Sequence, residues 1–152
     1  MHHLIETWII NQKMNQFLLD GINENHLADR STFKGRSVGE QFAHIHNVRL
    51  MWVKVAAPLL LSSQKKFEKE DLLSRQTLSE QLRQSSMAIE SVLEEGLTTG
   101  RVKGFKPHPE AFLGYMIAHE SHHRGQIILI LKEHAHLPDK KILYGLWEWG
   151  TK

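Results

Sequence analysis

The chain is organised around one stretch of eight residues, His119-Glu120-Ser121-His122-His123-Arg124-Gly125-Gln126. His119 and His123 are four positions apart, so on an α-helix their side chains project from one face, one turn apart. Four apolar residues fall within roughly 80° of His119 on a helical wheel of about 100° per residue, namely Phe112, Met116, Ile127 and Ile130. The two imidazoles are therefore predicted to face the interior. Two inward imidazoles at this spacing can chelate one divalent metal ion.

Four long segments of the chain have the periodicity of amphipathic helices. In each of them apolar residues recur at steps of three and four, which is typical of a helix with one buried face. The expected helices run from about His3 to Asp20, from Val38 to near Pro58, from Thr77 to about Glu95, and from Pro109 to about His134. Two capping-box patterns, Ser37 with Glu40 and Thr77 with Glu80, predict the starts of the second and third helices.

The connections between these segments complete the predicted architecture. A long crossover follows Pro58, and Pro138-Asp139 begins a short terminal element. The sequence shows neither the alternation of a β-strand nor a glycine-rich phosphate loop. We therefore predict an all-α four-helix bundle with a long crossover between helices two and three and a short C-terminal helix. Residues 1–152 are expected to form a single domain.

The composition excludes several classes of protein and of site. Because the chain has no cysteine, any metal must be held by nitrogen and oxygen ligands. The 19 basic and 17 acidic residues give a net charge of +2 without a basic stripe, so nucleic-acid binding is not expected. No apolar run reaches the 18 or so residues of a membrane span, and the N-terminus does not resemble a secretory signal. A cytoplasmic protein without a membrane partner is the expectation.

A metal site that acts on a substrate usually has three protein ligands and an open position. The fourth helix supplies two ligands, so the third is expected from a facing helix. The second helix offers His44 and His46. On a wheel each lies roughly 100° from the mean apolar direction, on opposite flanks, so periodicity does not choose between them.

The stretch from His119 to His123 also fits the H-E-x-x-H pattern of zinc metallopeptidases, in which the glutamate is the general base. A third ligand for such a site would have to be Glu133 or Glu148. Glu133 lies in the same continuous helix, roughly 20 Å from His119 at 1.5 Å per residue, and Glu148 lies in an aromatic tail. No strand is evident to bind a peptide. A metallopeptidase is therefore the minor alternative.

The residues beside His119 and His123 have less specific expected roles. Arg124 faces away from the pair and is expected to form a salt bridge or hydrogen bonds that fix the helix. Gln126 lies almost in line with His119, where it either orients an imidazole or is an ordinary polar residue at a helix seam. Gly125 is expected where another helix approaches closely. His122 lies on a flank, and neither it nor Glu120 is assigned a role.

Two stretches resemble the DinB/YfiT-like superfamily of small metal-binding four-helix bundles. Ser37-Val38-Gly39-Glu40-Gln41-Phe42-Ala43-His44-Ile45 is similar to the second-helix motif of that family, and the stretch from His119 to Gln126 is similar to its fourth-helix motif. The order and spacing of all four helices agree as well. The resemblance implies a divalent metal ion held by His44, His119 and His123, and thereby selects His44 over His46. It implies zinc or nickel, with iron or copper as further options.

The resemblance also implies a function. Characterised members include thiol-dependent S-transferases and isomerases that use bacillithiol, mycothiol or glutathione, and several form homodimers. We therefore expect a metal-dependent enzyme, a thiol-dependent S-transferase or a hydrolase, that acts on a small molecule such as a low-molecular-weight thiol. No residue is assigned a catalytic role. The alternatives are a non-catalytic, stress-associated protein with a structural metal, and a metal-free protein whose histidine pair is a polar feature of the core.

Overall fold

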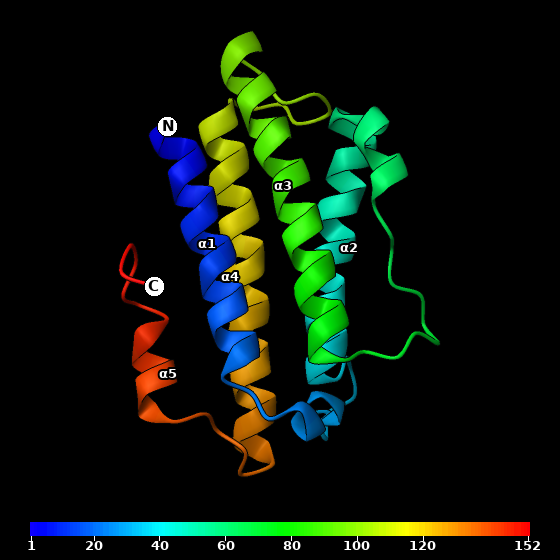
Figure 1. Cartoon of the computed structure of the whole chain (residues 1–152), viewed down its shortest axis with the longest axis vertical. Helices are drawn as coiled ribbons and strands as arrows, with labels where there is room; N and C mark the ends of the chain where they lie inside the picture. Colours follow the sequence, from blue (N-terminus) through cyan, green and yellow to red (C-terminus); the bar gives the residue numbers. More distant parts are fainter.

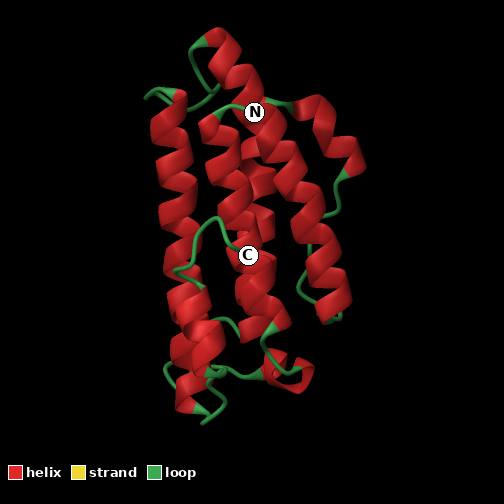
Figure 2. Ribbon diagram, turned by 60° about the vertical axis from the view of Figure 1, so that its left-hand side comes forward, coloured by secondary structure: helices red, strands yellow, loops and turns green.

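Five α-helices and two short 3₁₀ helices make up the structure, which contains no β-strand (Figure 2). The computed structural model describes residues 1–152 without a gap. In chain order the elements are α1 (His3–Asp20), η1 (Glu24–Ala28), α2 (Val38–Ala56), η2 (Pro58–Ser63), α3 (Arg75–Thr99), α4 (Pro109–Glu133) and α5 (Lys140–Gly145). The predicted all-α fold is confirmed. No helix combines the length and the apolar composition that crossing a bilayer would require.

The four long helices lie side by side with their axes roughly aligned (Figure 1). α1 and α2 each pack against both α3 and α4. The long crossover between α2 and α3 runs down the outside of the bundle, as Figure 1 shows, and α5 packs beside α1. At that contact Gly145 lies so close to the Phe17 ring that an added Cβ would be 2.5 Å from it. The tail beyond α5 leaves Trp147 83% exposed, so this side chain does not cover the end of the bundle.

The helix ends explain one confirmed boundary and two wrong ones. The capping box before α2 is present, with the Ser37 hydroxyl accepting from the Glu40 N–H at 3.2 Å and the Glu40 carboxylate accepting from the Ser37 N–H at 2.8 Å. The predicted start of the third helix at Thr77 is wrong, because Ser74 is the N-cap and accepts from the Thr77 N–H at 3.1 Å. The predicted end near Glu95 is also wrong. α3 continues to Thr99, and Gly100 adopts the left-handed conformation (φ 76°) that ends it.

A layer of buried polar side chains divides the apolar core into two halves. One half contains Leu18, Phe42 and Ile127, and the other contains Trp8, Ile89 and Phe112. Every long helix contributes buried polar side chains between these two groups, namely Asn11 and Asn15 on α1, Arg49 on α2, Ser85 and Ser86 on α3, and Glu120 and Arg124 on α4. The histidines of the fourth helix lie at the level of this layer. Buried polar groups of this kind are tolerated only when each finds a partner.

Candidate metal centre

Three histidines from two helices converge beside the polar layer. His44 comes from α2, and His119 and His123 come from α4. One ring nitrogen of each lies within 4.8 Å of one ring nitrogen of the other two. The His119 and His123 Nε2 atoms are 3.2 Å apart, and the His44 ring centroid is 4.6 Å from that of His123. The structure thus brings together the three residues named from the sequence, and they form the only such group along α2 and α4.

The distances within this cluster fit a metal ion. Two nitrogens bound to one tetrahedral zinc ion, at about 2.0–2.1 Å each, are about 3.3 Å apart. The observed 3.2 Å between the Nε2 atoms of His119 and His123 is close to this separation. The Nδ1 atom of His123 lies 2.6 Å from the Gln41 amide oxygen, which accepts only from an N–H. Its Nε2 therefore carries the lone pair, and that lone pair is the one that faces the cluster.

All three imidazoles are neutral near pH 7. Burial lowers the pKa of His123 to about 4, with further repulsion from His119 and His44. Burial, together with the charge of Arg36, lowers the pKa of His44 to about 4, and burial also lowers the pKa of His119. Metal ions bind the neutral form of imidazole, so protons compete with a metal only in acid. The cluster is therefore ready to bind a metal at neutral pH.

Gln41 is the residue that orients a ligand of the cluster, and it was not expected from the sequence. It lies one turn before His44 on α2, and its side chain is buried against His123. The orienting role considered for Gln126 is not observed, because its amide oxygen is buried without a hydrogen-bond partner. The expected close approach of another helix at Gly125 is not observed, since a Cβ added there would meet no atom within 4 Å. No close helix approach requires glycine at that position.

Glu120 points away from the cluster and into the polar layer. Its carboxylate forms an ion pair with Arg49 at 2.7 Å, and both side chains are 0% exposed. The side-chain amides of Asn11 and Asn15 donate to the same carboxylate at 2.6 and 2.7 Å. Burial opposes ionisation of Glu120, but the charge and hydrogen bonds of Arg49 outweigh it and hold the pKa below its ordinary value. A carboxylate so engaged is a poor general base, which argues against the metallopeptidase alternative.

Arg124 completes the same network. Its guanidinium donates to the side-chain oxygens of Asn11 and Asn15 at 3.0 and 2.6 Å, and to the Ser121 hydroxyl at 2.9 Å. The expectation that Arg124 makes hydrogen bonds that fix the helix is confirmed. Arg124 thus joins α4 to Asn11 and Asn15 on α1, and Arg49 joins α2, α3 and α4, so the network connects all four long helices.

His46 lies outside the cluster, on the opposite flank of α2 from His44. Its Nε2 atom is 2.7 Å from the Lys65 carbonyl oxygen, and the side chain is fully buried. The neighbouring Asn47 exchanges two hydrogen bonds with the backbone of Phe67, at 2.9 and 3.0 Å. These contacts fasten the long crossover to α2. His46 therefore has a structural partner and is not available to the metal site.

The chain is similar to known proteins in both family and fold. A family model described as the DinB family matches residues 1–146. The chain belongs to the DinB family. A DinB-like protein from Bacillus cereus ATCC 10987 has a similar structure, with a TM-score of 0.63 at 20% identity over 90% of this chain and 93% of that one. A second DinB-like protein, YjoA from Bacillus subtilis, matches with a TM-score of 0.64 at 19% identity over 91% of this chain and 97% of that one. No curated protein matches.

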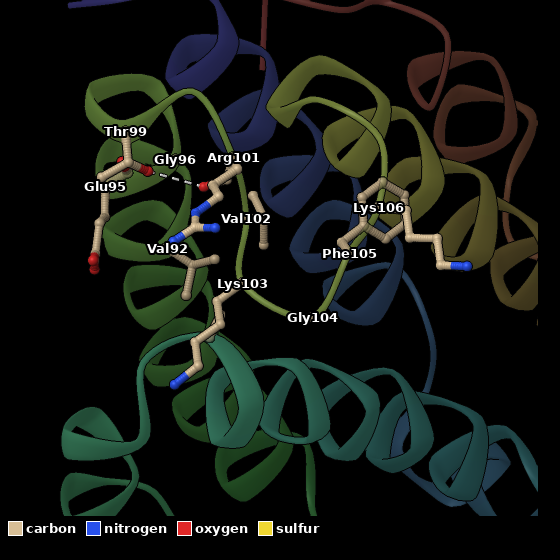
Figure 3. Close-up of a pocket in the computed structure, with 11 residues that line it drawn as sticks. Val92, Glu95, Gly96, Thr99, Arg101, Val102, Lys103, Gly104, Phe105 and Lys106 are labelled. Atoms are coloured by element: carbon tan, nitrogen blue, oxygen red, sulfur yellow. Dashed lines mark hydrogen bonds between the residues drawn. The ribbon is translucent and has the colours of Figure 1, made fainter.

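A surface cavity of this DinB-family protein lies away from the histidine cluster. It has a volume of about 650 Å³ and is lined by the last turns of α3 and by the loop that leads to α4 (Figure 3). Ala56, at the end of α2, is part of its wall, whereas His44 lies twelve residues earlier, about 18 Å along the helix. None of the three clustered histidines lines this cavity. Within the cluster, His44 and His119 are partly exposed, whereas His123 is buried.

The Gln41 contact leads to a prediction about metal affinity. We expect Gln41→Ala to weaken zinc binding at the cluster about 10–100-fold, which is the usual effect of removing a partner that orients a ligand histidine. Competition with a chelating dye measures the affinity. Gln126→Ala is the matched control, since its amide oxygen forms no hydrogen bond with a histidine of the cluster. Equal affinities for Gln41→Ala and the wild type would contradict the orienting role.

The buried His46 ring leads to a prediction about pH. Burial lowers the pKa of His46 to about 4, because the charged imidazolium would lose its hydration in the interior, and the charge of Arg49 adds to the effect. The unfolded chain takes up this proton at its ordinary pKa of 6.5, so the contribution of His46 is complete above pH 6.5 and is lost as the pH falls toward 4. The interval between these two pKa values corresponds to roughly 3 kcal/mol.

Urea unfolding of metal-free protein at several pH values between 7.5 and 4 tests this prediction. The other buried histidines contribute to the same slope, so the comparison is with His46→Gln, whose amide can still donate to the Lys65 carbonyl and does not titrate. We expect a shallower fall in unfolding free energy for the variant. Parallel curves for the two proteins would contradict it.

Proposed function

We propose that this DinB-family protein binds one divalent metal ion through His44, His119 and His123 and uses it in catalysis on a small molecule. The observation that carries the proposal is the convergence of three neutral imidazoles with no fourth protein ligand among them. Three protein ligands leave coordination positions for water or substrate, which is the arrangement of catalytic sites. Two of the ligands, His44 and His119, are partly exposed, so a small substrate can reach the metal.

The donor set and the family support the nature of the metal and of the reaction. Imidazole ligands suit zinc and nickel, and also iron and copper. Such an ion supplies a Lewis acid that lowers the pKa of a bound water or thiol. The protein holds the His123 ring in place through Gln41 and keeps all three imidazoles neutral through burial. We propose thiol S-transfer with a low-molecular-weight thiol as the reaction, with hydrolysis as the second possibility.

A turnover screen tests the proposal. Protein loaded with Zn²⁺ or Ni²⁺ is incubated with glutathione, bacillithiol or mycothiol and a panel of electrophiles, and the loss of free thiol is followed. A parallel panel of esters tests hydrolysis. We expect turnover by the wild type and by the control His3→Ala, whose side chain is exposed on α1. His44→Ala is expected to lose it, and equal turnover by His44→Ala would remove the metal from the mechanism.

A structural role for the metal is the second candidate, and the position of the ligands favours it. The ion would join α2 to α4, and His123 is only 5% exposed. A purely structural ion stabilises the folded state without supporting any reaction. On that reading, metal removal lowers the melting temperature while no substrate of the screen is turned over. The polar layer already connects the same helices, which is why we favour catalysis.

A further inference from the structure

A second group of donor side chains lies at the end of the bundle where α4 finishes. His26 is on η1, Asp29 follows directly after η1, and His136 follows α4. One donor atom of each lies within 4.8 Å of the others. The three residues come from two connections, one between α1 and α2 and the other between α4 and α5. Figure 1 shows both connections at the lower end of the bundle.

The contacts among the three side chains bring their donors to one point. The His136 Nδ1 atom is 2.6 Å from a carboxylate oxygen of Asp29. The His26 and His136 rings are stacked, with their centroids 3.6 Å apart and an angle of 5° between their planes. The Asp29 side chain is 12% exposed and that of His136 is 35% exposed. The carboxylate is thus largely covered, while solvent reaches the edge of one imidazole.

The backbone around this group is fixed on both sides. α4 ends with two hydrogen bonds, from the His136 N–H to the Leu131 carbonyl at 2.8 Å and from the Ala135 N–H to the Lys132 carbonyl at 3.1 Å. This is the Schellman arrangement, and it places Ala135 in the left-handed region at φ 56°, where glycine is the usual residue. A non-glycine residue held in this region is a strained feature that often accompanies function.

Further hydrogen bonds hold the two connections together. The Glu133 carboxylate accepts from the Ser31 hydroxyl and the Thr32 N–H, both at 3.1 Å. The His134 Nε2 atom is 2.8 Å from the Arg30 carbonyl oxygen. These contacts keep the backbones that carry His26, Asp29 and His136 in register without using any of the three donor groups. The donors are therefore positioned by their surroundings.

We propose that His26, Asp29 and His136 form a second divalent-metal site, separate from the cluster of His44, His119 and His123. Two imidazoles and one carboxylate are ligands for zinc and similar transition ions. A metal lies in the plane of each imidazole that binds it, so binding turns the two rings out of their stacked arrangement. The bound ion fastens the connection between α1 and α2 to the end of α4.

Counting bound zinc in the full-length, tag-free protein tests this site. Calorimetric titration with Zn²⁺ is expected to give two equivalents for the wild type and one for His136→Asn. His3→Asn is the matched control, because His3 is exposed at the start of α1 and belongs to neither donor group, and it should keep two equivalents. Equal stoichiometry for His136→Asn and the wild type would overturn the proposal.

A second set of variants keeps this test independent of the first cluster. In a His44→Ala/His119→Ala/His123→Ala background one equivalent is expected to remain, and adding Asp29→Asn should remove it. Zinc should also shift the ring-proton NMR signals of His26 and His136 in that background, and unchanged signals would refute the site. If the first cluster binds no metal, the wild type takes up one equivalent and His136→Asn takes up none. The experiment can therefore contradict the first metal site without contradicting the second, and the second without the first.

Discussion

Replacing Glu120 by glutamine is expected to lower the free energy of unfolding by about 3–5 kcal/mol, the usual cost of breaking a buried ion pair from one side. The guanidinium of Arg49 is fully buried and is paired with the Glu120 carboxylate at 2.7 Å. In the variant it keeps its hydrogen bonds to the Leu82 carbonyl and the Ser85 hydroxyl, at 2.9 and 3.3 Å, but loses its counter-charge. Urea unfolding at pH 7, with metal absent, measures the difference.

An exposed ion pair provides the control for this prediction. Glu80 and Arg83 are paired at 2.9 Å, but their side chains are 50% and 56% exposed. Glu80→Gln is therefore expected to leave the free energy of unfolding close to that of the wild type. The double variant Arg49→Met/Glu120→Gln removes both charges and should recover part of the loss. Together with Glu120→Gln and Arg49→Met alone, it gives the coupling energy of the pair. A loss below 1 kcal/mol for Glu120→Gln alone would show that the polar layer is not a main support of the fold.

The polar layer also shows which parts of the fold the sequence could predict. The periodicity of apolar residues predicted four helices, and for α1 it predicted both ends correctly. The same periodicity carries no information about which polar residues meet inside the bundle. Glu120 and Arg49 are 71 positions apart, and on their own helices each is only one charged residue near an apolar stripe. Such a pair can be predicted only when the packing of α2 against α4 is known.

The two histidine groups differ in how much of each could be predicted. His119 and His123 lie on one helix, so their spacing alone placed them on one face. The choice between His44 and His46 depended on how α2 is rotated against α4, which the helical wheel left open. The residues His26, Asp29 and His136 lie in connections without periodicity, and nothing in the sequence brought them together. Gln41 was missed because its contact with His123 depends on how α2 packs against α4, although its spacing of three from His44 was a usable signal.

Replacing His123 by alanine is expected to weaken metal binding at the first cluster about 100- to 1,000-fold. Structural zinc sites with four ligands bind with about 10–16 kcal/mol, so one ligand contributes roughly 3–4 kcal/mol, which corresponds to that change in affinity. His123 is the best-positioned ligand of the three, since it is the most buried and Gln41 fixes its ring. Chelator competition with Zn²⁺ measures the affinity, and a His136→Asn background removes the contribution of the second site.

The same variant links binding to stability, which gives the prediction a second measurement. In the His136→Asn background, zinc at about 100 times its dissociation constant should raise the unfolding free energy of the intact first cluster by about 2.7 kcal/mol. At the same zinc concentration His123→Ala should keep less than about 0.5 kcal/mol of this increase. His122→Ala is the matched control, because this neighbouring imidazole is exposed and lies outside the donor group. If His122→Ala loses the zinc-dependent increase while His123→Ala keeps it, the ligand assignment is wrong. If both keep it, zinc stabilises the fold from elsewhere, and the convergence of the three histidines does not mark a metal site.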